Sequence, residues 1–305
     1  MQKFFARTFL SIILLSGALT SFSQDENYDW WNKKHNWDGI SDWASYLTYS
    51  PAYLGPNALP VPEIRNALIE TKVRLETRAD LHFSKGDNTQ NLFIKLLYPF
   101  WDGRVAVEIY GVPVEHFKMD TITRDERAGR DPDAEGYAAG DIYFGTLIQL
   151  VREHKHWPDL LLGITLRTAS GGNVGNARYT DAPGYYFDIS AGKTFFADSK
   201  LSLRPYLMFG FYAWQTNRDE YRQNDAFLYG LGLSLFNEKF ECNAKYGGYK
   251  GYIGNGDAPM VLRANAIYKF PKTHLKLSFQ QGLQDFDYST FSLGAIFYFK
   301  SPQGH

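Results

Sequence analysis

Apolar and polar residues alternate with a period of two along most of the chain after residue 66. The clearest run extends from Ile69 to Phe83, where apolar residues and Thr occupy the odd positions and a charged residue or His occupies every even position. A period of two places the two sets on opposite faces of a β-strand, whereas a helix would spread both sets around its circumference. The run therefore predicts a strand with one apolar face and one charged face.

The same alternation recurs in eleven further segments. They cover residues 92–98, 105–109, 142–150, 160–166, 187–191, 201–211, 227–235, 240–246, 260–268, 275–279 and 291–299. Together with 69–83 they make 12 candidate strands, and single-chain transmembrane barrels of bacteria have an even number of antiparallel strands.

The lengths of the connections also alternate. Short connections are expected at 101–103, 152–159, 197–200, 237–239 and 271–274. The connections between them lie at 84–90, 118–140, 168–184, 215–225, 250–259 and 285–287, and four of these six are longer. Transmembrane barrels have short periplasmic turns and longer extracellular loops. The sequence thus predicts an all-β fold, a single transmembrane antiparallel β-barrel of about 12 strands over residues 67–300.

Aromatic residues make up 17% of the chain, and many fall near the predicted strand ends. Two girdles of aromatic side chains are typical where a barrel crosses the lipid–water boundaries. The periplasmic girdle is predicted from Tyr98, Phe100, Trp101, Phe195, Phe236, Phe240, Tyr268, Phe270, Phe297 and Phe299. The outer girdle is predicted from Phe83, Phe117, Phe187, Phe211, Trp214, Phe227, Tyr229 and Phe291.

Residues 1–23 have the pattern of a secretory signal peptide. Lys3 and Arg7 precede the apolar stretch Phe9–Leu19, which is followed by small and polar residues. The apolar stretch is too short to cross a bilayer core of roughly 30 Å as a helix. We therefore expect an exported protein, with residues 301–305 as a short tail after the barrel.

The leader ending at Ser23-Gln24, the strands of 67–299 and the terminal strand Phe291–Phe299 resemble outer-membrane β-barrels of the Bacteroidota type, in the broad porin-like or substrate-channel class. This resemblance implies the outer membrane of a Gram-negative bacterium, in contact with outer-membrane lipid and lipopolysaccharide. It identifies an architecture and no particular substrate, because a fold alone does not define a function.

Residues 24–66 lack the alternation and contain four of the seven Trp residues, namely Trp30, Trp31, Trp37 and Trp43. They end in the proline-rich stretch 55–62, which fits neither a helix nor a central strand. Three alternatives are open: a plug in the lumen, a cap on the periplasmic rim, or a docking segment for an envelope protein. An ordered plug or cap is favoured, because four Trp side chains need a surface to cover.

The polar face of the strands is expected to line the lumen. By this parity, eleven basic and seven acidic residues point inward. The predicted lining is Glu70, Lys72, Arg74, Glu76, Arg78, Lys95, Arg104, Glu108, Tyr110, Arg167, Asp188, Arg204 and Arg263. Such charges either pair with one another structurally or form a path that selects anions, since Arg and Lys in a pore favour anions.

Catalytic residues are sought on the same face. His82 and His116 are assigned inward parity near the outer strand ends, with Asp80 beside them. A nucleophile–His–acid set needs hydrogen-bond contact between its members, which sequence does not establish. No catalytic set, metal site or cofactor is therefore predicted, and the single Cys242 excludes a disulfide framework.

The formal net charge of −1 argues against a nucleic-acid partner, because sequence-independent binding needs a basic excess. The sequence favours a narrow or gated channel or transporter for a small polar solute, including an anionic one. Two alternatives remain: a barrel enzyme that modifies lipid, and a non-catalytic barrel subunit of an envelope complex.

Overall fold

The structure is a computed structural model that describes residues 28–197 and 199–299. The expected signal peptide and the tail 301–305 lie outside the described residues. The chain divides into two compact units, one ending at Gly39 and one beginning at Ile40. In the first unit, helix α2 (Asp29–Lys34) carries Trp30 and Trp31. Among the described residues, no helix is long and apolar enough to span a membrane.

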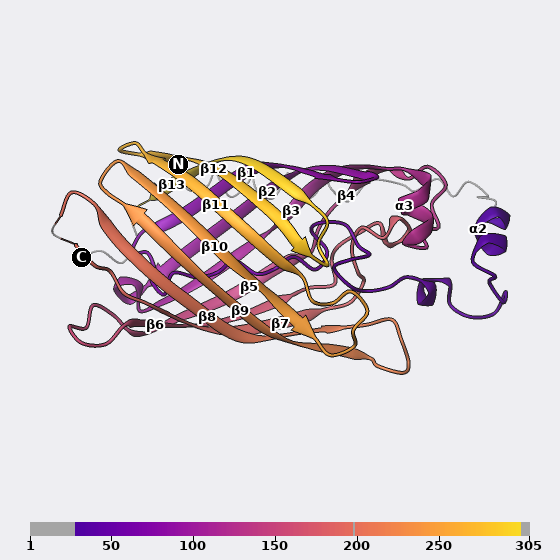
Figure 1. Ribbon diagram of the computed structural model, residues 1–305, viewed down its shortest axis with the longest axis horizontal. Helices are drawn as coiled ribbons and strands as arrows, with labels where there is room; N and C mark the ends of the chain where they lie inside the picture. The colour runs from indigo at the N-terminus through magenta and orange to yellow at the C-terminus, as the bar shows by residue number, and fades with distance from the viewer. Residues whose placement is uncertain (1–27, 198, 300–305) are drawn as a thin grey trace, which may run out of the picture. The chain divides into compact units, whose positions relative to one another are not determined.

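The second unit contains a closed barrel of twelve antiparallel strands, as the sequence predicted (Figure 1). Strand β1 pairs with β2 on one side and with β13 on the other, which closes the ring. The barrel strands are β1 (Val73–Ser84), β2 (Asp87–Phe100), β3 (Val105–Met119), β5 (Ile142–Val151), β6 (Asp159–Arg167), β7 (Gly184–Gly192), β8 (Ser202–Gln215), β9 (Gln223–Phe236), β10 (Phe240–Gly251), β11 (Met260–Lys269), β12 (Thr273–Gln284) and β13 (Ser289–Phe299). The short strand β4 (Glu135–Ala138) pairs only with β3.

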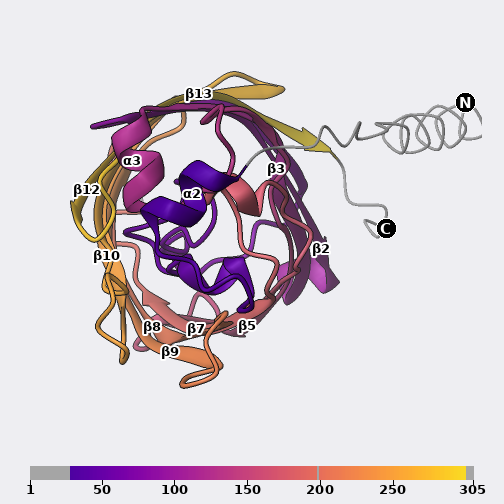
Figure 2. The ribbon, with the colours of Figure 1, turned by 90° about the vertical axis from the view of Figure 1, so that its right-hand side faces the viewer.

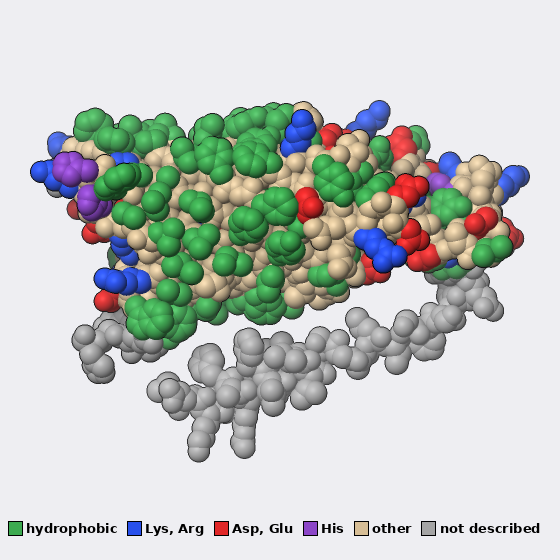
Figure 3. Space-filling view, turned by 90° about the horizontal axis from the view of Figure 1, so that it is seen from below, with side chains coloured by type: hydrophobic (Ala, Val, Ile, Leu, Met, Phe, Trp, Pro, Cys, Tyr) green, Lys and Arg blue, Asp and Glu red, His purple; other side chains and the backbone are tan. Residues whose placement is uncertain are grey.

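The apolar residues of the alternating pattern lie on the outer face of the barrel strands. Leu231, Leu277 and Leu293 are each more than half exposed on the outer face. The space-filling view shows apolar side chains gathered over the middle of the barrel and charged ones towards its ends (Figure 3). A continuous apolar band of this kind is unfavourable in water and is suited to lipid.

The two ends of the barrel differ in their connections. At one end, here called the turn end, the connections include η2 (Trp101–Gly103) and residues 237–239 and 270–272. At the other, the loop end, the longer connections carry α3 (Thr121–Glu126), β4 and η3 (Val174–Asn176). Helix α3 begins where the Asp120 carboxylate accepts a hydrogen bond from Thr123 N at 2.7 Å.

Residues 47–72, here called the inner segment, follow η1 (Trp43–Tyr46) and run inside the ring of strands (Figure 2). At the loop end, Ser50 Oγ donates to Asn255 O at 3.0 Å. At the turn end, Ile69 N donates to Gln149 Oε1 at 2.9 Å. The segment therefore runs through the lumen from the loop end to the turn end.

The first barrel strand begins later than the alternation predicted. Ile69 was expected on the outer apolar face, but it is buried in a cluster with Ala67, Leu97 and Leu161. This cluster forms because the inward face near the turn end carries Leu97, Ala106, Leu147 and Leu161 instead of charges. Burial against these residues keeps Ile69 in the inner segment.

Two aromatic residues predicted for the outer girdle point inward instead. The indole of Trp214 is 1% exposed and donates to Tyr49 O of the inner segment at 3.2 Å. Phe117 is fully buried with Met119 and Ala134. Its inward direction follows from a bulge opposite Phe93, where β3 has one extra residue and the faces of the strand exchange.

Candidate functional site: a basic cavity beside the inner segment

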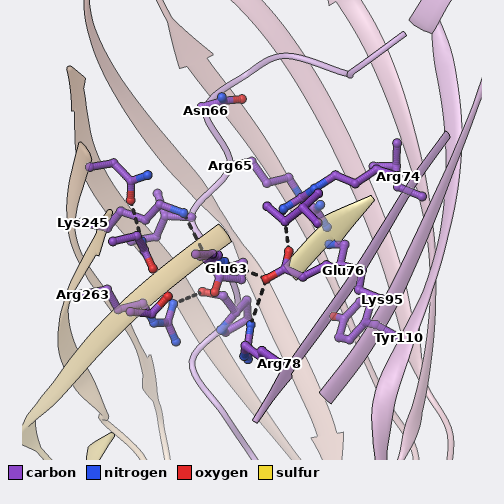
Figure 4. Close-up of a pocket in the computed structure, with 18 of the residues that line it drawn as sticks. Glu63, Arg65, Asn66, Arg74, Glu76, Arg78, Lys95, Tyr110, Lys245 and Arg263 are labelled. Carbon is purple, nitrogen blue, oxygen red and sulfur yellow. Dashed lines mark hydrogen bonds and ion pairs between the residues drawn. The ribbon is translucent and has the colours of Figure 1, made fainter. Parts of the chain in front are cut away.

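A cavity of about 690 Å³ lies beside the inner segment, and inward side chains from around the barrel line it, including those of β1–β3 and β8–β13 (Figure 4). Its lining contains eleven basic and six acidic side chains. The basic residues are Arg65, Lys72, Arg74, Arg78, Lys95, Arg152, Arg204, Lys245, Arg263, Lys269 and Lys276. The acidic residues are Glu63, Glu70, Glu76, Asp80, Glu108 and Glu241.

Three cations surround Glu76 on the β1 side of the cavity. Its carboxylate accepts from Arg74 at 2.5 Å and from Lys276 at 2.8 Å, and Arg78 lies 3.6 Å away. Arg78 also pairs with Asp80 at 2.8 Å and lies over the ring of Phe93. Glu76 is therefore fully paired, and its side chain is 4% exposed.

A second carboxylate of the cavity is that of Glu63 in the inner segment. Lys245 Nζ lies 3.1 Å from the Glu63 carboxylate. Arg263 donates to the backbone oxygens of Val61 and Pro62 at 2.6 and 2.9 Å. Figure 4 shows Lys245 and Arg263 beside this stretch. Two wall cations thus hold the inner segment by one carboxylate and two carbonyl groups.

Arg65 joins the inner segment to two other strands. Its guanidinium lies 2.9 Å from Glu108 of β3 and 3.1 Å from Asp188 of β7. Lys95 pairs with the second oxygen of Glu108 at 2.6 Å. Both carboxylates are fully buried, so removal of Arg65 would leave uncompensated charge in a site of low dielectric constant.

Glycines in the barrel wall make room for the inner segment. A Cβ added at Gly230 would lie 2.6 Å from Ile64 Cγ1, and one added at Gly247 would lie 2.6 Å from Ile64 Cδ1. Ile64 itself is 2% exposed. The inward glycines of β9 and β10 therefore form a recess that any larger residue would close.

A second ionic network lies towards the loop end. Asp87 Oδ2 accepts hydrogen bonds from Arg127, Arg178 and Tyr288. Arg178, from the loop 168–183, also donates to Glu115 at 2.8 Å. Burial by itself lowers the pKa of Arg178, but the carboxylates of Glu115 and Asp87 raise that pKa above its ordinary value. The network ties the three connections that carry Arg127, Arg178 and Tyr288 to β2 and β3.

The sequence-predicted lining residues fall into three groups. Ten line the cavity: Glu70, Lys72, Arg74, Glu76, Arg78, Lys95, Glu108, Tyr110, Arg204 and Arg263. Arg167 and Asp188 face inward but are covered by the inner segment, through Ala58 O at 2.9 Å and Arg65 at 3.1 Å. Arg104 is exposed in the turn before β3, outside the cavity lining, because the strand begins only at Val105.

Of the three catalytic candidates, His82 and Asp80 are linked through Asn91, whereas His116 lies apart. His82 is buried inside, bonded to Thr290 at 2.8 Å and Asn91 at 2.7 Å. Asn91 in turn donates to Asp80 at 2.9 Å. The inward parity assigned to His116 is wrong: beyond the bulge in β3 it lies on the other face, near Glu135. Among residues 28–197 and 199–299, no cluster of metal-ligating side chains is present.

Sequence reasoning missed Glu63 and Arg65. The pattern Pro60-Val61-Pro62-Glu63-Ile64-Arg65 does indicate an extended chain with alternating side chains. Nothing in the sequence identifies their partners, which are 43 to 182 residues away along the chain.

No protein-family model and no curated protein matches this sequence. Solved structures match it in fold. An outer-membrane channel from Pseudomonas putida F1 aligns with a TM-score of 0.50 and 12% identity, covering 80% of this chain and 97% of that chain. LpxR from Salmonella typhimurium aligns with a TM-score of 0.48 and 8% identity over 73% and 100% of the two chains. A KdgM porin in complex with disordered oligogalacturonate aligns with a TM-score of 0.44 and 10% identity, covering 74% of this chain and 99% of that chain. At such identities the likeness concerns the fold alone.

Proposed function

We propose that the chain is an outer-membrane barrel that takes a small anionic solute into its lumen, and that the inner segment is a plug that gates this passage. The basic cavity carries the proposal: eleven cationic and six acidic side chains line it. Cationic rings in a pore favour anions, and charges act more strongly inside a protein than in bulk water.

Nine of the eleven lining cations form ion pairs, whereas Lys72 and Arg263 form none within the part of the chain that the structure describes. Lys245, Arg263 and Lys276 come from three adjacent strands, while Glu63 and Glu76 are the carboxylates they contact or face. Lys72 adds positive charge near the turn end of the same cavity, where Lys269 is paired with Glu241. This distribution supports attraction of an anion from that end.

The contacts of the inner segment support a gate. Between Val61 and Arg65 it is held by ion pairs and by hydrogen bonds to backbone oxygens, which water or a polar solute can replace, and by Ile64 in its glycine recess. Around Ala67 and Ile69 it is held by apolar burial. The middle of the segment can therefore be released while the apolar cluster keeps it attached next to β1.

Reversal potentials in planar bilayers under a KCl gradient test the proposal with the full chain. We expect chloride selectivity, and we expect Arg65→Gln to lengthen the open times because it loosens the segment. Arg218→Gln, in the exposed loop 216–222, is the control for a change of net charge. A cation-selective pore would contradict the proposal. Absence of measurable conductance in both the wild-type protein and the Arg65 variant would also contradict it.

A further inference from the structure

We propose that Glu63 is a tethered stand-in for the carboxylate of the solute, and that the site around it takes a small hydroxylated organic carboxylate. This inference rests on the proposed function and adds the substrate class and the way in which the solute opens the plug. Three observations support it. Glu63 and Glu76 differ in the number of their ion pairs, the Arg263 guanidinium donates two hydrogen bonds to the inner segment, and neutral polar side chains of four neighbouring strands line the cavity.

The two carboxylates of the cavity differ in how firmly they are held. Glu76 is 4% exposed and has three cationic partners. The side chain of Glu63 is 45% exposed, towards the cavity, and within the described residues its one ion pair is with Lys245. Glu76 is therefore a fixed part of the wall, whereas Glu63 occupies a position from which another anion can displace it.

Arg263 indicates the kind of anion. Its Nη1 and Nη2 atoms donate to the carbonyl oxygens of Pro62 and Val61, and its Nε donates to Gln280 at 2.6 Å. Two parallel donors on one guanidinium match the two oxygens of a carboxylate. Lys245 lies directly opposite Arg263 in the register of β10 and β11. Displacement of residues 61–63 would free this pair of cations for one carboxylate group.

A row of neutral polar side chains lies next to these cations, towards the turn end. Asn243, Asn265, Ser278 and Ser292 are consecutive partners across β10, β11, β12 and β13. All four line the cavity. Ser278 Oγ is buried and has no hydrogen-bond partner among the described residues. Amide and hydroxyl groups in such a row bind hydroxyl groups of a ligand, which favours a hydroxylated carboxylate over a purely apolar one.

Binding of the solute and displacement of the inner segment then occur in the same step. A carboxylate that replaces Glu63 on Lys245, and the carbonyl oxygens of Val61 and Pro62 on Arg263, removes the wall's hold on this stretch of the segment. The solute can shift the plug only by its differential affinity for the displaced state. Loss of the Glu63 carboxylate should therefore strengthen solute binding.

Titration calorimetry on the purified full-length protein at low salt tests this, with D-gluconate as the probe and D-glucitol as its uncharged counterpart. We expect Glu63→Gln to tighten gluconate binding about tenfold, since one charge-assisted hydrogen bond corresponds to roughly that factor in an equilibrium constant. Lys245→Gln should weaken binding by a similar factor. Glucitol should bind to none of the variants, and acetate more weakly than gluconate.

Asp42→Asn is the matched control. Asp42 precedes η1, lies outside the cavity lining, and its replacement removes the same charge. Its gluconate affinity should stay within about twofold of wild type, well inside the effect of one charge-assisted hydrogen bond. Heat-modifiable migration on gels reports whether each barrel is folded, and Glu63→Ala gives a second variant that removes the carboxylate.

The inference is overturned if both Glu63 variants bind gluconate no more tightly than wild type, or if Asp42→Asn tightens binding as much. It is also overturned if glucitol binds as well as gluconate. In each of these cases an anion-selective reversal potential would leave the proposed function standing. A cation-selective pore would instead overturn the proposed function.

Discussion

The Arg65 guanidinium lies 2.9 Å from the Glu108 carboxylate, across 43 residues of sequence. Asp188 accepts from the same side chain at 3.1 Å, so one Arg connects the inner segment to β3 and β7. Both acidic partners are fully buried. This arrangement makes Arg65 the main ionic attachment of the segment to that side of the barrel.

Replacing Arg65 by Met should loosen the inner segment. The change leaves Asp188 without its ionic partner and Glu108 with Lys95 alone. Breaking a buried pair by removing one member typically costs about 3–5 kcal/mol. We expect faster hydrogen–deuterium exchange in residues 57–66, while the barrel strands keep their protection. Unchanged exchange there would show that Arg65 does not hold the segment.

The recess for Ile64 gives a second prediction. Gly230→Ala places a methyl group 2.6 Å from Ile64 Cγ1, so the segment must shift and lose stability. Ile64→Ala should relieve the overlap, so the double variant should be more stable than the sum of the single changes predicts. A double-mutant cycle measured by local exchange tests this coupling, which is of order 0.5–3 kcal/mol for residues in contact.

Gly175→Ala is the control for that cycle, because nothing lies within 4 Å of a Cβ added at Gly175. It should show no coupling to Ile64→Ala. Strictly additive effects of Gly230→Ala and Ile64→Ala would contradict the placement of Ile64 in this recess.

The contacts near the start of the inner segment predict the side of the membrane from which that start is accessible. Asn217, in the loop 216–222, donates to Leu47 O at 3.0 Å, and Arg130 lies over the ring of Trp43. Ile40 is 91% exposed. A cysteine at Ile40 should therefore react with a membrane-impermeant maleimide from the same side as one at Asp219, in cells with an intact outer membrane.

Lys272→Cys, in the connection between β11 and β12, is the matching variant at the turn end. It should react only after permeabilisation. Cys242 is exposed and is replaced by Ala in all three proteins. Labelling of the Ile40 variant together with the Lys272 variant would contradict the direction in which the segment traverses the lumen.

Tyr49 predicts a loss of local stability at alkaline pH. Burial, and the hydrogen bond from its hydroxyl to Asp181 at 2.7 Å, raise the pKa of Tyr49. The unfolded side chain loses its proton near pH 10, below the folded value, so the unfolded form binds fewer protons above that pH. The contribution of this group is therefore fully present below about pH 10 and is lost as the pH rises towards the folded pKa.

Hydrogen–deuterium exchange in residues 47–55, corrected for the intrinsic pH dependence of exchange, measures this loss. Tyr49→Phe should be less stable at neutral pH, because the hydrogen bond to Asp181 is absent. It should also show a shallower decline above pH 10. Equal declines in the two proteins would show that Tyr49 does not contribute.

The strand pattern was predictable because each strand needs only a local signal. Strands such as β9 and β13 present alternate residues to lipid and to the lumen, so period two is visible in the sequence itself. The assignment failed where one residue was inserted. The bulge in β3 exchanges the faces between Tyr110 and Glu115, which moved His116 outward and Phe117 inward. Pro113 is a residue type that occurs at bulges because it has no N–H for the ladder, but it does not show how many residues are inserted.

By itself the sequence determined the twelve-strand barrel, the outward apolar band and the preference for basic residues on the inner face, because these follow from alternation and composition. Only the tertiary structure decided what the inner charges do. Glu63, Arg65, Lys245 and Arg263 meet across long separations in sequence, since ring closure and the path of the inner segment set their distances. Pairing of charges depends on such distances, and residue order does not encode them locally.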